Sequence, residues 1–342
     1  VISKQVGQLF STLRLERGNR QLEDRPLPPQ VEQVAWKGGR REVTWTDSPA
    51  LLLDLQRVTR SIKPDVIHAG PVPNVAFLAA LSGFKPLVSM SWGSDLLRDI
   101  DLDGGKMRSA RFALRRSAIL LGDCAAVKQK AVSLGFPSER VVLFPWGVDL
   151  QTFSPAPGGE RRQRLGWQDA FVLLSLRSWE PLYGVDLVVR AFCRAAQELP
   201  ELRLLMLGNG SQAPLIHSLV QTQQMLDRVH FAGQVKNDDL PDYYRSADLY
   251  LSASHSDGSS VSLMEALACG KPVLVSDIPG NREWVGGQAA GWLFKDGDEE
   301  ALVEGIRRAA RERQTLPERG KSARVLAEQR ADWNKNFARL LE

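Results

Sequence analysis

Short apolar runs rich in β-branched residues alternate with helical patterns along the chain from about residue 65. Such alternation is typical of strand–helix–strand units and parallel sheets. The pattern therefore predicts an α/β fold with doubly wound parallel sheets. The runs that we expect to form strands are residues 65–68, 86–90, 141–144, 171–176, 202–207, 229–232, 248–252 and 272–276.

Two helices are well marked. Asp47 and Ser48 precede Pro49, which is a typical helix start, and the apolar residues of 50–58 continue it. After Gly184, apolar residues recur at helical spacing, as expected of a helix with one buried face. They are Val188, Ala191, Phe192, Ala195 and Leu199.

The length of 342 residues suits two domains, each with its own core. Proline and glycine concentrate in residues 154–159, where we place the linker. The expected parts are a first domain over residues 1–154, a second over 155–328 and a final helix over 329–342. The amino-terminal residues do not match the start of such a domain. A parallel α/β domain should begin with a buried apolar strand, but here a helical pattern continues through Arg14. We therefore expect the first strand of this domain to be missing.

Composition narrows the function classes. No apolar run approaches the roughly 20 residues of a membrane-spanning helix. The three cysteines are odd in number and widely spaced, which favours a reducing compartment and a cytoplasmic protein. No histidine or cysteine spacing predicts a metal site. The cysteines are Cys124, Cys193 and Cys269.

The net charge of +4 suits phosphate-bearing ligands or an anionic membrane surface. Residues 106–116 place several cations along one helix, as either a solvated face or a patch for peripheral contact with the inner face of a membrane. No motif for nucleic-acid binding is present. We therefore expect a phosphorylated ligand and no nucleic acid.

Residues that follow the predicted strands carry the candidate chemistry, because ligands of parallel sheets bind beyond the carboxyl ends of the strands. In the second half, these positions combine glycines, a cation and a carboxylate, which would suit a phosphorylated ligand. They are Arg177, Gly208, Gly210, Gly233, Val235 and residues 254–258.

The segment 257–270 is the most informative. Asp257, Gly258, Ser259 and Ser260 lead directly into a helical run, so free backbone N–H groups would face an anion there. Glu265 lies among apolar residues of that run, where a carboxylate needs polar partners. Sugar hydroxyls could be these partners. The alternative is a structural salt bridge for Glu265 and an ordinary helix cap at Ser259.

Several motifs resemble family-four retaining glycosyltransferases. In the second half these are VHFAGQV (229–235), LPDYY (240–244), ADLYLS (247–252), the segment 257–273 that ends in EALACGKPV, IPGNRE (278–283) and GWLF (291–294). In the first half they are KPDVIH (63–68), GSD (93–95) and PWGVDLQTF (145–153). The resemblance implies a GT-B fold, with two facing Rossmann-like domains, an active site in the cleft between them and a final helix that returns to the first domain.

The resemblance also implies residue roles. The paired acidic motif falls on Asp257, which would contact the donor sugar, and on Glu265, which would bind the ribose. Arg177 would neutralise the diphosphate, and the backbone of residues 258–260 would lie against it. On the acceptor side, the corresponding positions are His68, Trp92, Gly93, Ser94 and Asp95.

Three positions depart from the family pattern. Asp257 replaces a glutamate, Trp92 replaces a frequent histidine, and the lysine expected shortly after Arg177 is absent from a region that contains Tyr183. Loss of one cation weakens stabilisation of the leaving group unless another group compensates.

The sequence therefore predicts a retaining hexosyltransferase that needs neither a metal nor a further cofactor. It would use a UDP-sugar, or next a GDP-sugar, and a glycan, lipid-linked or small-molecule acceptor. One alternative is a catalytically silent GT-B protein that binds nucleotide sugars. Another is an NAD-dependent oxidoreductase, because Gly208, Gly210 and Ala213 match a loose dinucleotide fingerprint. An NAD-binding site of this type would need an acidic residue at the end of the next strand, but Asp227 precedes that strand.

The Asp-x-Asp pairs at 99–103 and 296–298 are interpreted as surface turns.

Overall fold

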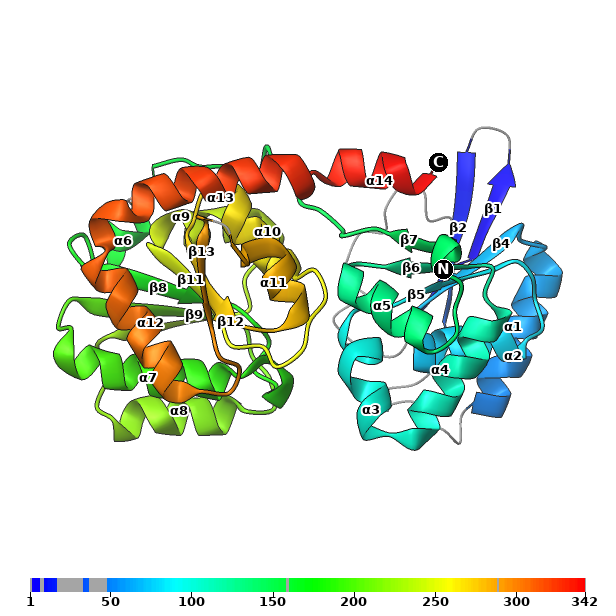
Figure 1. The fold of residues 1–342 in the computed structure, drawn as a ribbon, viewed down its shortest axis with the longest axis horizontal. Helices are drawn as coiled ribbons and strands as arrows, with labels where there is room; N and C mark the ends of the chain where they lie inside the picture. Colours follow the sequence, from blue (N-terminus) through cyan, green and yellow to red (C-terminus); the bar gives the residue numbers. More distant parts are fainter. Residues whose placement is uncertain are drawn as a thin grey trace. The chain divides into compact units, whose positions relative to one another are not determined.

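The computed structural model describes residues 2–6, 9–16, 33–36, 48–157, 160–287 and 289–341. Contacts within the chain divide it into two units, residues 1–143 and residues 144–342 (Figure 1). Each unit is built around one β-sheet with helices packed on it.

The first unit contains a seven-stranded sheet in the order β3-β2-β1-β4-β5-β6-β7. Strands β4 to β7 are parallel, and of these β4, β5 and β7 were predicted whereas β6 was not. Strand β1 is antiparallel to both β2 and β4, so the sheet is mixed. The strands are β1 Ile2–Val6, β2 Leu9–Glu16, β3 Gln33–Trp36, β4 Val66–Ala69, β5 Leu87–Met90, β6 Ile119–Gly122 and β7 Val141–Leu143.

The helical pattern predicted through Arg14 is wrong. Residues 9–16 form β2, in which Leu13 and Leu15 alternate with Arg14 and Glu16 at the period of a strand. This strand pairs antiparallel with β1, with Val6 opposite Leu9. Cross-strand pairing, which a local helical reading cannot detect, decides the structure of this segment.

Helices of the first unit cover a core of small and branched apolar side chains, such as Ile67, Leu87 and Leu120. The predicted helix after Ser48 is confirmed as α1. The helices are α1 Ser48–Ile62, η3 Val72–Ala76, α2 Phe77–Leu81, η4 Asp95–Asp99, α3 Ile100–Leu102, α4 Gly104–Arg116, α5 Ala125–Ser133 and η5 Ser138–Arg140.

The second unit contains a fully parallel six-stranded sheet in the order β10-β9-β8-β11-β12-β13. In chain order this is 3-2-1-4-5-6, the Rossmann arrangement, and the order reverses between β8 and β11. The five strands predicted for this half are confirmed, and β13 is added at one edge. The strands are β8 Phe171–Ser175, β9 Leu202–Leu207, β10 Val229–Gly233, β11 Leu249–Ser252, β12 Val273–Ser276 and β13 Gly291–Phe294.

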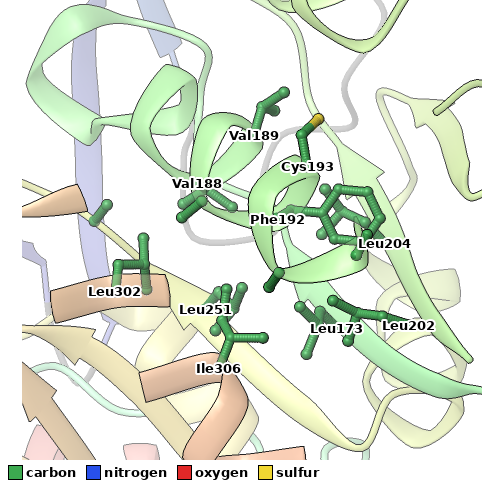
Figure 2. Close-up of a cluster of buried hydrophobic side chains, with 14 of the residues drawn as sticks. Leu173, Val188, Val189, Phe192, Cys193, Leu202, Leu204, Leu251, Leu302 and Ile306 are labelled. Atoms are coloured by element: carbon green, nitrogen blue, oxygen red, sulfur yellow. The ribbon is translucent and has the colours of Figure 1, made fainter. Parts of the chain in front are cut away.

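Two hydrophobic clusters flank this sheet. One lies between the sheet and helices α7 and α12, where Phe192 and Ile306 pack with Leu204 and Leu251 (Figure 2). The other includes residues of α9, α10 and α13. The helices are α6 Glu160–Leu165, η6 Pro181–Tyr183, α7 Val185–Glu198, α8 Ala213–Thr222, η7 Asn237–Asp239, α9 Leu240–Ser246, α10 Val261–Ala268, α11 Pro279–Val285, α12 Glu299–Arg311, η8 Arg313–Thr315, α13 Leu316–Arg330 and α14 Trp333–Leu341.

Residues 144–153 belong by their contacts to the second unit, ahead of the predicted boundary at 154. Val148 and Phe153 are buried in one of its clusters, and Val148 forms a β-bridge with Asp332 next to α14. The return of the final helix to the first domain stays a prediction.

The prediction that the Asp-x-Asp pairs form surface turns is confirmed for 296–298 and wrong for 99–103. Residues 295–298 form a turn closed by the N–H of Asp298 and the carbonyl oxygen of Lys295 at 3.1 Å, and Asp296 is exposed. Asp99 and Asp101 lie on short helices, and Asp103 accepts hydrogen bonds as the N-cap of α4. Asp298 likewise caps α12, and Asp296 pairs with His255 at 2.7 Å. Aspartates at helix starts satisfy free N–H groups, which explains their position without a ligand.

Candidate functional site

Arg177 lies at the point where strand order reverses in the second unit. It follows β8, and Asp257 follows the neighbouring strand β11. In open parallel sheets, this switch point is where ligands bind. The predicted convergence of a cation and a carboxylate on this edge is present in the structure.

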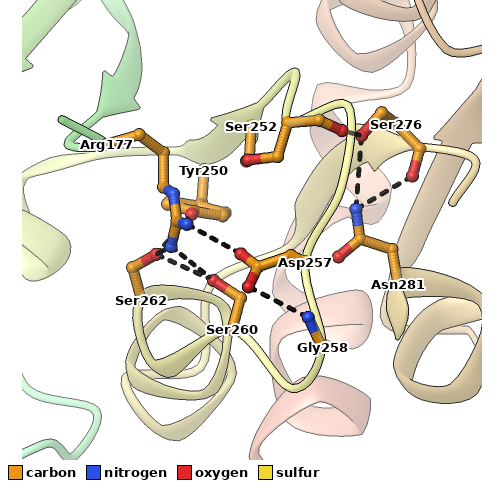
Figure 3. A network of polar contacts seen from close by, with 10 residues as sticks. Arg177, Tyr250, Ser252, Asp257, Gly258, Ser260, Ser262, Ser276 and Asn281 are labelled. Atoms are coloured by element: carbon orange, nitrogen blue, oxygen red, sulfur yellow. Dashed lines mark hydrogen bonds and ion pairs between the residues drawn. The ribbon is translucent and has the colours of Figure 1, made fainter. Parts of the chain in front are cut away.

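The guanidinium of Arg177 is held on several sides. Its Nη2 donates to Oδ2 of Asp257 at 2.7 Å, and its Nη1 donates to the hydroxyls of Ser260 at 2.8 Å and Ser262 at 3.1 Å (Figure 3). The ring of Tyr183 lies against it, 4.2 Å from the guanidinium carbon to the ring centroid. The Arg177 side chain is only 14% exposed. These contacts fix the orientation of the cation.

The Nε of Arg177 is buried and has no hydrogen-bond partner among the described residues. Buried polar groups are usually hydrogen-bonded, so this N–H can still donate one hydrogen bond.

The first turn of helix α10 contacts Arg177 through Ser260 and Ser262. Ser260 is its N-cap residue, but its side chain makes no capping hydrogen bond and instead accepts from Arg177. The first N–H groups of the helix therefore lack their usual side-chain acceptor, and the helix dipole adds partial positive charge there. The N-cap is thus Ser260 and not Ser259, whose hydroxyl accepts from the indole N–H of Trp284 at 3.1 Å.

The loop before α10 is closely packed. Gly258 donates its N–H to Oδ1 of Asp257 at 3.0 Å. Gly280, at the start of α11, lies so near that a methyl group there would collide with the carbonyl oxygen of Gly258. Figure 3 also shows Asn281, which donates to the carbonyl oxygen of Ser276 at 2.9 Å. This packing fixes the backbone that faces the switch point.

Glu265 lies on α10 and is 7% exposed. Its Oε2 accepts from the hydroxyl of Tyr244 at 2.7 Å. Burial raises the pKa of Glu265 to about 7, although the Tyr244 hydrogen bond and the charge of Arg177 oppose this shift. Within the described residues, Glu265 makes no ion pair, so the structural salt bridge that we considered is not what holds it.

The glycines of the other loops line the same edge. Gly208 has a φ of +97° and donates its N–H to the carbonyl oxygen of Gly233 at 2.7 Å. Gly210 lies against the backbone of Trp179, where a side chain would not fit. Val235 packs against a core cluster.

In the first unit, Asp95 is 5% exposed and serves as a local anchor. Its Oδ1 accepts from the hydroxyl of Ser91 at 2.6 Å and the N–H of Trp92 at 2.9 Å, and its Oδ2 accepts from the N–H of Val72 at 2.8 Å. Burial raises the pKa of Asp95, and these hydrogen bonds oppose the shift.

The anchored loop presents Trp92, whose side chain is 56% exposed. Gly93 follows with a φ of +87°, and Ser94 precedes η4. His68 lies on β4, and burial lowers its pKa to about 4, so its imidazole is neutral at pH 7. The predicted acceptor-side residues therefore cluster around β4 and β5.

Ser262 and Tyr244 contact predicted site residues but were not predicted themselves. Ser262 is a polar residue in an apolar helix, two positions after the cap, and this is the signal that could have identified it. Tyr244 lies within the motif 240–244, but nothing local indicates that its hydroxyl would reach Glu265.

The model of the family described as glycosyl transferases group 1 matches residues 159–338, and that of glycosyl transferase 4-like proteins matches residues 19–123. The chain belongs to the glycosyl transferases group 1 family. This confirms the resemblance drawn from the motifs, and it removes support from the oxidoreductase alternative. In this group 1 glycosyl transferase, Gly208 follows the second strand of its unit, β9, and Asp227 precedes β10.

Curated relatives share part of the chain. D-inositol 3-phosphate glycosyltransferase of Kineococcus radiotolerans is 36% identical over 184 residues, which are 50% of this chain and 42% of that protein. A GDP-mannose-dependent alpha-(1-6)-phosphatidylinositol monomannoside mannosyltransferase of Mycolicibacterium smegmatis is 24% identical over 80% of this chain and 74% of that protein. The matched segment thus spans less than half of the first of these relatives.

Solved structures share the fold. Anabaena HepE in complex with UDP-glucose is similar with a TM-score of 0.78 and 20% identity, over 90% of this chain and 84% of that chain. Sucrose-phosphate synthase from Thermosynechococcus elongatus is similar with a TM-score of 0.74 and 20% identity, over 92% and 79%. Together with the two α/β units, these likenesses confirm the GT-B fold class, whereas the cleft between the domains stays a prediction.

Two features are absent from the described part of the chain. No helix is long and apolar enough to cross a membrane. No group of three or more histidine, cysteine, aspartate or glutamate side chains there is arranged to hold a metal ion.

Proposed function

We propose that this chain is a retaining glycosyltransferase that takes a sugar from a nucleotide diphosphate without a catalytic metal. The observation that carries the proposal is the cluster of Arg177, Asp257 and the uncapped start of α10 at the switch point of the second unit. A cation, free N–H groups and a helix dipole together suit a diphosphate leaving group.

The donor would bind along this edge. Glu265 would accept hydrogen bonds from the ribose hydroxyls, and Asp257 would face the donor sugar. Gly208, Gly210 and the backbone of residues 258–260 would allow close approach of the ligand. UDP-glucose is the ligand in the HepE structure, and GDP-mannose is named for the Mycolicibacterium relative, so UDP-sugars and then GDP-sugars are the donors to test first.

The acceptor would bind to the first unit. Trp92 offers an exposed apolar face to a sugar or cyclitol ring, and Asp95 holds the loop that carries it. The names of the relatives point to inositol phosphates and phosphatidylinositol glycolipids as acceptor classes. With a lipid-linked acceptor, the cations on α4 would contact the inner face of an anionic membrane while the protein stays cytoplasmic.

Nucleotide binding is expected to be independent of divalent ions. Calorimetric titration with UDP and GDP should give the same affinity in the presence of a chelator and in the presence of Mg²⁺, because Arg177 and the start of α10 supply the positive potential. Binding that disappears with the chelator would contradict the metal-free mechanism.

Transfer is expected to retain the anomeric configuration, with an oxygen of the leaving phosphate assisting removal of the acceptor proton on the same face. NMR of the product measures the configuration directly. An inverting enzyme would need a general base on the acceptor side, and Asp95 is a carboxylate placed there.

The Asp95→Asn variant separates these mechanisms. Both oxygens of Asp95 accept backbone or hydroxyl hydrogen bonds, so asparagine would place its amide against an N–H group and destabilise the unit by about 1–3 kcal/mol. Activity per folded molecule should stay within about tenfold of the wild type, whereas loss of a general base lowers the rate about 10²–10⁴-fold. An inverted product together with an inactive variant would overturn the proposal.

The alternative of a catalytically silent nucleotide-sugar-binding protein is tested without knowledge of the acceptor. Slow hydrolysis of a bound nucleotide sugar in water alone would exclude it.

A further inference from the structure

The cation at the proposed donor site is neutralised by the protein's own carboxylate. Arg177 pairs with Asp257, and Tyr183, in the region where the family resemblance expects a second cation, contributes only a neutral ring. The side chains of the pair are 14% and 16% exposed, so solvent screens their attraction only in part. A diphosphate that approaches Arg177 therefore meets a carboxylate already bound to it.

We propose that the donor diphosphate and Asp257 exchange places on Arg177. A phosphate oxygen would take over Nη2, and the released Oδ2 of Asp257 would accept a hydrogen bond from a hydroxyl of the donor sugar. This inference rests on the proposed function, and it makes Asp257 a residue that distinguishes the intact donor from the bare nucleotide.

The geometry of the guanidinium suits such an exchange. Asp257 contacts it through Nη2 alone, whereas Nη1 is held separately by Ser260 and Ser262, and Tyr183 covers one face. Loss of the Asp257 contact therefore leaves the cation in place. Planar guanidinium groups can bind two oxygens side by side, and the unpartnered Nε is next to Nη2 in the same fork.

Asp257 can also move without unfolding the loop. Its Oδ1 accepts the N–H of Gly258, and this hydrogen bond does not involve the oxygen that contacts Arg177. The loop is held independently by the Trp284 contact to Ser259 and by the close approach of Gly280 to Gly258. Only the Oδ2 contact needs to change.

The exchange predicts a preference for the donor over its product. A bare nucleoside diphosphate must break the Asp257–Arg177 contact and gives Asp257 no new hydrogen-bond donor. A nucleotide sugar breaks the same contact but supplies a sugar hydroxyl to the freed carboxylate. Asp257 would therefore weaken binding of the released diphosphate relative to the intact donor and so favour product release.

The test is calorimetry of Asp257→Asn with UDP, GDP, UDP-glucose and GDP-mannose. Asparagine keeps the size of the side chain and a neutral acceptor for Nη2 but removes the competing charge. We expect the bare diphosphate that the wild type binds to bind about tenfold to 100-fold more tightly, which is the scale of one charge-assisted hydrogen bond. The matching nucleotide sugar should bind no more tightly than before.

Asp248→Asn is the matched control. Asp248 precedes β11, whereas Asp257 follows it, so the two lie at opposite ends of one strand. Asp248 pairs with Arg162 at 2.8 Å, and the two side chains are 15% and 21% exposed, close to the values of the Arg177 pair. Loss of this carboxylate should leave nucleotide affinity unchanged.

Substitutions of Tyr183 test whether its ring holds the guanidinium of Arg177 in place. Tyr183→Phe keeps the ring over Arg177 and should preserve the affinity for UDP, whereas Tyr183→Leu removes the ring and should weaken it. A purely structural role of the ring would lower the unfolding temperature of Tyr183→Leu without affecting the nucleotide affinity of the folded protein.

Unchanged or weaker binding of the bare diphosphate to folded Asp257→Asn would overturn the exchange. If this variant does not fold, Asp257→Ser removes the same charge and gives the same comparison. If the wild type itself binds none of the four nucleotides, the proposed function fails, and this result is independent of any variant.

Discussion

Glu265→Gln is expected to weaken nucleotide binding and at the same time to stabilise the protein at pH 8. The carboxylate is 7% exposed, and within the described residues its hydrogen-bond partner is the hydroxyl of Tyr244. Glutamine has the same size and can still accept from Tyr244, but it carries no charge that must be buried. Loss of a charged acceptor for the ribose hydroxyls should lower the affinity by about 1.5–3 kcal/mol.

The gain in stability follows from the pKa of Glu265, which rises from 4.5 to about 7 on folding. Between these values the folded state binds more protons than the unfolded state, so the free energy of unfolding falls as pH rises through this window. The total penalty above pH 7 is about 3 kcal/mol, at 1.36 kcal/mol for each pKa unit. Glutamine removes this penalty at pH 8 and makes little difference at pH 4.

The same pKa sets the pH dependence of binding. If the ribose binds the ionised form, the affinity for UDP should be constant above pH 7 and fall below it, and Glu265→Gln should abolish this dependence. Urea unfolding at pH 4 and pH 8, together with calorimetry between pH 5.5 and pH 8.5, measures both effects. A destabilised variant with unchanged affinity would mean that Glu265 is a structural residue.

Strands β8, β11 and β12 of the second unit could be predicted because they are buried on both faces and form continuous apolar runs in the sequence. All five residues of β8 are buried, and the adjoining polar residue, Arg177, marks the functional edge. Arg177 and Asp257 could be predicted as site residues because each follows one of these recognisable strands.

The features that the sequence did not predict depend on contacts between segments, which a local pattern cannot reveal. Strand β2 depends on antiparallel pairing with β1, which a local pattern does not reveal. The contacts of Arg177 with Ser262 and of Glu265 with Tyr244 join residues 85 and 21 positions apart in the chain. The sequence predicts that Arg177 and Asp257 bind the donor, but it could not show that they bind each other.

Arg177→Met is expected to give the largest loss of activity. Methionine fills much of the same volume but cannot stabilise the negative charge that develops on the leaving diphosphate, so kcat should fall about 10²–10³-fold. The variant should also lose stability, by about 2–3 kcal/mol, because Asp257 is left half-buried without its partner. Stopped assays of sugar transfer or donor hydrolysis, together with urea unfolding, measure the two losses separately.

The double variant Arg177→Met/Asp257→Asn distinguishes the two origins of these losses. Asparagine removes the unpaired charge, so the double variant should regain most of the stability that Arg177→Met loses, and the two substitutions should be strongly non-additive in the free energy of unfolding. Turnover should not recover, because the leaving diphosphate still lacks its cation. Recovery of turnover in the double variant would show that Arg177 serves only to neutralise Asp257, and the positive charge for the leaving group would then have to come from outside this cluster.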